Sequence, residues 1–159
     1  MPLAAGRMGL LTPVLTLGRP IREPYSVRAS FFVAFLGGPF GIILFSMVNS
    51  WRLERLRSDA PSYVALATVA ACAMFVTTYW VSSGAMPTWA VPLGEGPSAA
   101  NHLSRIVGLA VMAIVYLRHR RLLKAQAIAG NNFANPWAIG LGCVVVGTAI
   151  GFSVALLAR

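Results

Sequence analysis

The sequence is poor in charge, and its few charges avoid three long stretches. Charged residues make up 11% of the 159 residues, against roughly 25% in an average globular domain. None of them lies within 29–50, 61–94 or 126–158. A membrane-spanning helix needs roughly 20 mainly apolar residues, and each stretch is long enough to supply one. The scarcity of charge therefore excludes an ordinary soluble domain and predicts an integral membrane protein.

Acidic residues are the rarest charges, and they lie outside the charge-free stretches. The chain has only Glu23, Glu54, Asp59 and Glu95. An ionisable group inside a membrane is costly and is usually kept for function, as in small transporters driven by protons. The sequence therefore argues against a proton-coupled four-helix antiporter. We expect Ser58 or Asp59 to cap a helix in a surface connector.

Cysteine and histidine are equally scarce, with two of each. Cys72 and Cys143 both fall in apolar stretches, which excludes a disulfide framework. His102 and His119 have no cysteine or carboxylate near them in the sequence, so neither a metal site nor a nucleophile–base pair is indicated. We expect both histidines at the membrane surface. No catalytic residue, cofactor or metal is assigned. A function without catalysis is favoured, and a lipid-modifying enzyme that uses His102 or His119 is the least favoured alternative.

Hydrophobic residues make up 57% of the chain and divide it into blocks. The predicted fold is all-α, a polytopic helical membrane protein built as a four-helix bundle. An irregular basic tail over 1–28 precedes a single transmembrane domain over 29–159. The expected spans are 30–50, 63–81, 99–117 with a basic extension to 129, and 136–157.

The net charge of +9 comes from basic residues that flank these spans. Aromatic residues do not interleave with them, so the pattern does not suit nucleic acid. Basic residues concentrate in cytoplasmic loops of membrane proteins and bind anionic headgroups. We therefore place 51–62 and 118–135 in the cytoplasm and 82–98 outside. The expected cytoplasmic anchors are Arg52, Arg55, Arg57, Arg118, Arg120, Arg121 and Lys124.

The first span contains the helix-breaking sequence Gly37-Gly38-Pro39. One alternative is a full span that bends at these residues, and the other is a re-entrant hairpin that returns to the side it entered. The basic residues of the N-terminal tail favour the hairpin, because it would put them in the cytoplasm. Backbone groups left unpaired in lipid favour the kinked full span, since a four-helix protein would give a turn little cover. The kinked span is the expectation, with the side of the N-terminus left open.

The same region carries a resemblance. The run "ASFFVAFLGGPFGIILFSMVNSWRL" has an F-x-G-G-P motif and an asparagine, Asn49, ten residues after Pro39. It resembles the first span of small uncharacterised bacterial membrane proteins with four predicted helices and a late aromatic-led segment like "NPWAIGLG". The resemblance implies this general layout in a bacterial inner membrane and transfers no activity.

Small residues recur at helical spacing in two spans. Lipid provides no hydrophobic drive for helix association, so such faces allow close backbone contact. They can serve packing within one bundle, a homo-oligomer or a membrane-protein partner. The expected function is that of an accessory or partner-binding subunit without catalysis. The alternative is a small oligomeric channel or facilitator lined by the broken first span. The packing residues are Gly147, Gly151 and Ala155 in one span and Ala67 and Ala71 in the other.

Overall fold

The computed structural model describes residues 23–85, 97–128 and 133–158, and all regular structure within these ranges is helical. The helices are α2 (Val27–Arg52), α3 (Leu56–Ser83), α4 (Pro97–Ile128) and α5 (Trp137–Leu157). The predicted all-α class with four helices is confirmed. All four helices are long and apolar enough to cross a membrane by length and composition. Of the expected irregular tail over 1–28, residues 1–22 lie outside the described residues, and residues 27 and 28 belong to α2. Most of the loop 82–98 and the end of the basic extension at 129 also lie outside them.

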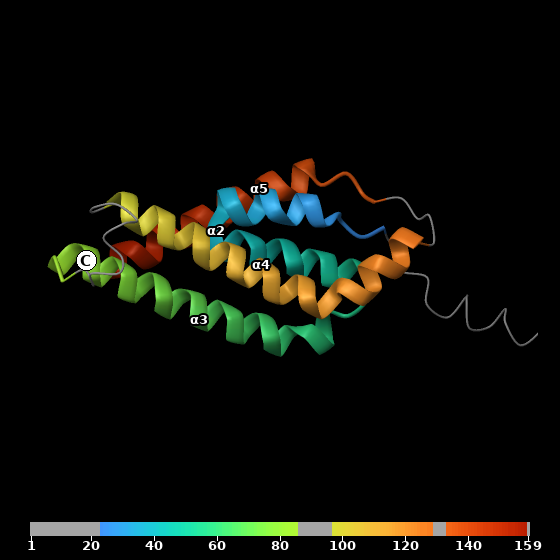
Figure 1. Ribbon diagram of the computed structural model, residues 1–159, viewed down its shortest axis with the longest axis horizontal. Coiled ribbons are helices and arrows are strands. Elements are labelled where there is room, and N and C mark those ends of the chain that lie inside the picture. The colour runs from blue at the N-terminus through green and yellow to red at the C-terminus, as the bar shows by residue number, and fades with distance from the viewer. Residues whose placement is uncertain (1–22, 86–96, 129–132, 159) are drawn as a thin grey trace, which may run out of the picture.

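Helices α3 and α5 run in one direction along the bundle, and α4 runs antiparallel to both (Figure 1). The connector between α2 and α3 lies at one end of the bundle, and α4 finishes at the same end. We call this the basic end. Of the lysines and arginines that the structure describes, all but Arg105 belong to segments at this end. Helix α3 begins earlier than expected, at Leu56. Ser58 and Asp59 lie inside its first turn, where the Ser58 hydroxyl donates back to the Arg55 carbonyl at 2.9 Å.

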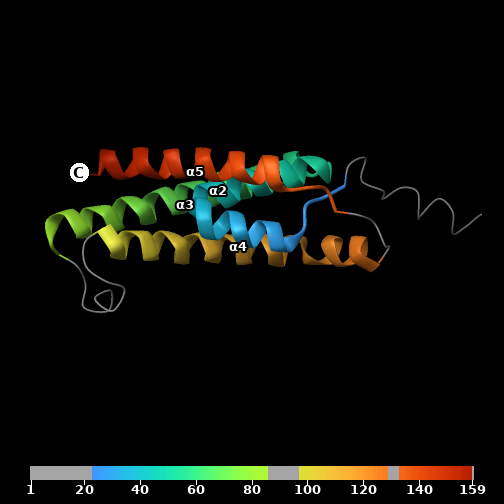
Figure 2. The same ribbon diagram turned by 90° about the horizontal axis from the view of Figure 1, so that it is seen from above.

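Helix α2 folds back on itself. Gly38 has φ 63° and ψ −161°, far from helical values. A straight helix of 26 residues would be about 39 Å long at 1.5 Å per residue. Instead, the Tyr25 N–H just before the helix donates a 2.9 Å hydrogen bond to Asn49 Oδ1 near its end. Figures 1 and 2 both show a first arm, 27–37, leaving the basic end and a second arm, 39–52, returning beside it. Helix α2 therefore does not run once along the bundle as the expected kinked span would, and its two arms form a hairpin.

Glycines of the neighbouring helices explain why the hairpin is tolerated. The tip, residues 37–39, is buried. A Cβ atom on Gly147 of α5 would lie 2.3 Å from the Gly41 nitrogen, and one on Gly108 of α4 would lie 2.8 Å from the Ala34 carbonyl oxygen. Backbone therefore packs directly on backbone at the tip. Non-helical backbone at membrane depth is stable when protein covers it. The expectation of little cover fails because three complete helices surround the hairpin.

The second arm supplies the centre of the core. Ile42 and Phe45 are completely buried, and the Tyr25 ring packs on the Phe45 ring with centroids 5.0 Å apart. The segments that precede α2 and α5 close the basic end together, since the Ala134 N–H donates to the Pro24 carbonyl at 3.1 Å. The hairpin is thus packed on several sides and anchored at both of its ends.

Candidate functional site: a tip cavity and a buried polar cluster

The hairpin reaches only part of the way along the bundle and leaves a cavity beyond its tip. This tip cavity has a volume of about 320 Å³. Its floor is the Gly37–Pro39 turn, and its walls come from α3, α4 and α5. It extends away from the basic end, because its lining includes Asn101 near the start of α4 and Ala155 near the end of α5.

Polar side chains from three helices line the tip cavity. They are Thr78 of α3, Asn101, Ser104 and Arg105 of α4, and Thr148 of α5. The Ser104 hydroxyl lies at the tip, 3.1 Å from where a Cβ on Gly38 would be. The Arg105 guanidinium stands 4.8 Å from the centroid of the Phe35 ring on the first arm. The cavity therefore offers hydroxyl, amide and cationic groups.

A buried polar cluster occupies the other half of the molecule, where α2, α3 and α4 meet. The Asp59 carboxylate and the His119 ring are 1% and 5% exposed, and Oδ2 lies 2.9 Å from Nε2. This corrects the sequence analysis, which put Asp59 in a surface connector and His119 among the headgroups. The two residues are 60 positions apart, and the antiparallel packing of α3 and α4 brings them together.

Hydrogen bonds satisfy both carboxylate oxygens of Asp59. The Ser50 hydroxyl donates to Oδ2 at 3.1 Å, and Arg118 Nε donates to Oδ1 at 3.1 Å. The Tyr63 hydroxyl contacts the Ser50 hydroxyl and lies 3.2 Å from the Ser46 carbonyl oxygen, to which it can donate. A buried carboxylate is costly unless it is paired and hydrogen-bonded, and here it is both.

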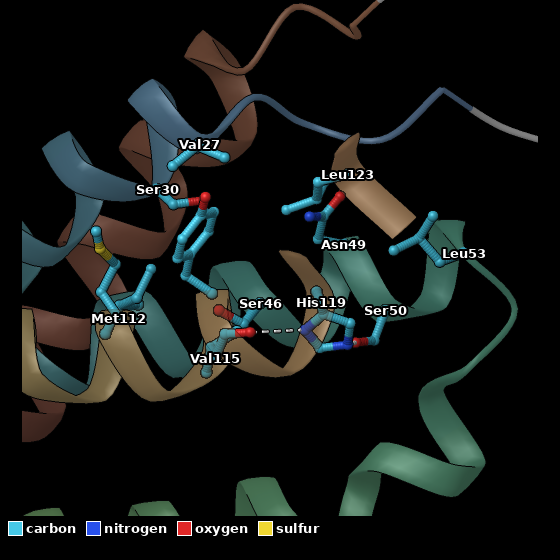
Figure 3. Close-up of a pocket in the computed structure, with 12 residues that line it drawn as sticks. Val27, Ser30, Ser46, Asn49, Ser50, Leu53, Met112, Val115, His119 and Leu123 are labelled. Carbon is cyan, nitrogen blue, oxygen red and sulfur yellow. Dashed lines mark hydrogen bonds between the residues drawn. The ribbon is translucent and has the colours of Figure 1, made fainter. Parts of the chain in front are cut away.

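The His119 ring has polar neighbours on both sides. Its Nδ1 lies 3.0 Å from the Val115 carbonyl oxygen (Figure 3), and its Nε2 faces Asp59. A hydrogen on Nε2 bonds the Asp59 carboxylate, and a hydrogen on Nδ1 bonds the Val115 carbonyl, so the tautomer decides which contact is a hydrogen bond. The ring therefore lies between a side chain of α3 and the backbone of its own helix.

A small inner cavity of about 20 Å³ adjoins the cluster. Its lining comes from both arms of α2 and from α4, and includes Ser30, Asn49, Ser50 and His119 (Figure 3). A polar cavity needs only roughly 10–15 Å³ to hold one water molecule. The inner cavity is therefore large enough for a single water beside the cluster.

The geometry of the cluster does not suit nucleophilic catalysis. In a serine–histidine–aspartate triad, the serine and the aspartate bind opposite nitrogens of the ring. Here the Ser50 hydroxyl and Asp59 both face Nε2, at 3.5 and 2.9 Å, and Nδ1 faces backbone. Among the described residues, no group of three or more His, Cys, Asp or Glu side chains could hold a metal ion.

The residues expected to pack helices lie on inner faces of the bundle. Gly147 lies against the backbone of the hairpin, and Ala155 lines the tip cavity. A Cβ atom added to Gly151 would lie 3.7 Å from the terminal methyl carbon of Met74. Ala67 and Ala71 are partly buried against the core. These small residues are therefore used within the chain, and Gly108 joins them although the sequence analysis did not single it out.

The expected basic anchors divide into two groups. Arg52 and Arg118 are engaged in the fold: Arg52 donates to the Glu23 carbonyl at 2.7 Å, and Arg118 binds Asp59 and the Ser62 hydroxyl. The others are exposed at the basic end, namely Arg55, Arg57, Arg120, Arg121 and Lys124.

One signal could have pointed to the buried cluster. Ser50, Asp59 and His119 lie in or beside the predicted connectors 51–62 and 118–135. Both connectors were expected on one side of the membrane, so a helical bundle would bring the three residues to the same end. Comparison of the chain with protein-family models, with curated proteins and with solved structures finds no match.

Proposed function

We propose that the chain is an integral protein of the bacterial inner membrane that acts as a small channel or facilitator for a polar solute. The observation that carries the proposal is the re-entrant hairpin, whose tip forms the floor of the polar tip cavity. Broken helices at membrane depth are typical of transport proteins, where they line a solute path. The solute would bind against the hydroxyl and amide groups of the cavity and pass when the tip moves.

The distribution of basic residues orients the protein. The hairpin puts Glu23 at the same end as the connector between α2 and α3, since Arg52 binds the Glu23 carbonyl. By the positive-inside rule this basic end faces the cytoplasm. The tip cavity then opens on the external side, and the exposed arginines hold the cytoplasmic end against anionic headgroups.

The partner-binding function expected from the sequence stays a prediction. Its motivation was the presence of small-residue faces, and these faces cover the hairpin inside the bundle. The tip cavity has no such alternative use in packing. The channel or facilitator function therefore accounts for more of the structure.

Flux into vesicles tests the proposal. The purified chain, reconstituted into lipid vesicles, should admit some members of a panel of small polar solutes and ions faster than empty vesicles do. Thr78→Val, which removes a hydroxyl from the tip cavity without changing the side-chain shape, should alter that flux. Thr68→Val is the matched control on the same helix, because the Thr68 side chain is exposed and bonds only its own helix at Val64. If vesicles with and without the protein show equal flux for every solute, the proposal is overturned.

A further inference from the structure

Within the described residues, the fold leaves the polar side chains of the tip cavity without hydrogen-bond partners. The Thr77 hydroxyl, which is not part of the lining, donates to the Ala73 carbonyl of its own helix at 2.7 Å. The next hydroxyl along α3, that of Thr78, faces the cavity and bonds no described residue. Polar groups inside a protein are normally hydrogen-bonded to protein or to water. The side chains that likewise lack a described partner in the cavity are Asn101, Ser104 and Thr148.

Arg105 is the one charged side chain among the described residues that line the tip cavity. It lies about 12 Å along α4 from Pro97, at 1.5 Å per residue. An ionisable group this far into a helix that is apolar enough to cross a membrane usually marks a functional site. Its guanidinium stacks 4.8 Å from the centroid of the Phe35 ring, and no described residue forms a hydrogen bond or ion pair with it. Stacking occupies the face of the planar group, so the N–H donors at its edge can bind a ligand.

The described carboxylates do not neutralise Arg105. They belong to Glu23, Glu54 and Asp59, which lie at the basic end, whereas the tip cavity extends away from that end. The Asp59 carboxylate is also already paired with Arg118. The cavity therefore combines one cationic group with several hydrogen-bond donors, and this combination suits a ligand that carries negative charge and accepts hydrogen bonds.

We propose that the tip cavity binds a small oxyanion, such as a carboxylate or a phosphate, through Arg105, Ser104 and Asn101. The inference rests on the proposed function, because it names the chemical class of the solute. A guanidinium presents parallel N–H groups that match two oxygens of a carboxylate or phosphate. Asn101 lies one helical turn before Ser104 and Arg105, so the three side chains adjoin on the surface of α4. The cavity volume of about 320 Å³ is near the lower end of the range of roughly 300–1,000 Å³ for small-molecule pockets, which favours a small ligand.

NMR in detergent micelles tests the site without depending on transport. A maltoside detergent has no phosphate or charge in its headgroup. Sodium phosphate and sodium acetate, added at constant pH, should each shift the backbone amide signal of Gly38 until it saturates. Gly38 reports on the cavity because a Cβ there would lie 3.1 Å from the Ser104 hydroxyl. Sodium chloride at the same ionic strength should shift the signal less, because chloride cannot offer two oxygens to the guanidinium.

Substitution of Arg105 decides whether this binding occurs at the proposed site. Arg105→Gln should weaken the binding of phosphate at least roughly ten-fold, because a charge-assisted hydrogen bond is lost. Arg105→Lys should keep part of the affinity, since lysine retains the charge without the planar fork. The matched control is Arg120→Gln, at an exposed arginine of the same helix at the basic end, and it should bind as the parent chain does.

Three results would overturn the proposal. They are the lack of a saturable shift, equal binding by the parent chain and Arg105→Gln, and a shift that appears only when phospholipid is added. The last result would mean that Arg105 serves a lipid headgroup instead of a free anion.

Ion selectivity in vesicles separates this inference from the channel or facilitator function. Vesicles that contain the parent chain should admit inorganic phosphate faster than potassium, and Arg105→Gln should abolish that preference. Faster entry of potassium would overturn the oxyanion inference and leave the channel or facilitator function standing. If no solute enters but phosphate binds in an Arg105-dependent manner, the channel or facilitator function is overturned and the oxyanion site is supported.

Discussion

The backbone N–H of Tyr25 and the side-chain oxygen of Asn49 are joined by a 2.9 Å hydrogen bond, although 24 positions separate the two residues. The Arg52 guanidinium reinforces the contact, because it stacks 4.3 Å from the centroid of the Tyr25 ring. A helix that crossed the bundle once would hold these groups far apart. The contact therefore fixes the entry and the exit of α2 at one end of the molecule.

Membrane topology follows from this contact. We expect a cysteine introduced as Glu23→Cys to be labelled from the same side of the membrane as one introduced as Glu54→Cys, and Ser83→Cys to be labelled from the opposite side. The three positions lie before α2, after α2 and at the far end of α3. A background with Cys72→Ala and Cys143→Ala removes the native thiols. Labelling of positions 23 and 83 from one side would restore the kinked full span.

Close packing of the hairpin against α5 should be sensitive to a single methyl group. Gly147→Ala would put a Cβ atom 2.3 Å from the Gly41 nitrogen, and backbone cannot yield as a flexible side chain can. Overpacking of this kind costs about 1–3 kcal/mol of unfolding free energy. Unfolding by denaturing detergent would measure the loss.

Gly142→Ala is the matched control in the same helix. No atom lies within 4 Å of a Cβ added there. The change should be neutral or should stabilise α5 by up to roughly 1 kcal/mol, because alanine favours helix over glycine. Equal destabilisation by the two substitutions would show that α5 does not pack on the hairpin as described.

The turn itself depends on the conformation of Gly38. Its φ of 63° with ψ of −161° lies in a region that only glycine adopts readily, and forcing another residue there costs on the order of 1–3 kcal/mol. Gly38→Ala should therefore destabilise the protein in the same unfolding assay. It should also disturb the floor of the tip cavity, since the added Cβ would approach the Ser104 hydroxyl.

Gly84→Ala provides the comparison for that substitution. Gly84 also has a positive φ of 68°, but it ends α3 in the left-handed helical region and has open space around it. We expect a smaller loss of stability there and no change in solute flux. If Gly38→Ala were the milder of the two, the tip would not be the strained point of the fold.

The number and class of the helices could be predicted from the sequence, whereas the path of the first one could not. Helix count depends on local hydrophobic length, which is visible in stretches such as 61–94. The choice between kink and hairpin depends on what covers the turn. That cover comes from Gly108 and Gly147, which lie far along the chain and look like ordinary residues of apolar spans.

The buried polar cluster escaped prediction for a related reason. Asp59 was judged by its neighbours in the sequence, Ser58 and Ala60, which are those of a surface connector. Its environment is set instead by His119 and by the fold of α2, which carries Ser50 inward. The local sequence pattern predicts helical spans and their caps. It does not predict which residues of two helices come into contact, because that depends on how the helices pack in three dimensions.

Coupling between Asp59 and His119 can be measured by a double-mutant cycle. Asp59→Ala should cost about 3–5 kcal/mol of unfolding free energy, because it leaves His119 and Arg118 without their buried partner. His119→Ala alone should also destabilise the bundle. The two together should cost less than the sum of the single changes, since each removes the same 2.9 Å contact. Glu54→Ala, at an exposed carboxylate, should add to His119→Ala without coupling. Strict additivity for Asp59 and His119 would mean that their 2.9 Å contact contributes nothing to stability, and the cluster would then be incidental to the hold on the hairpin.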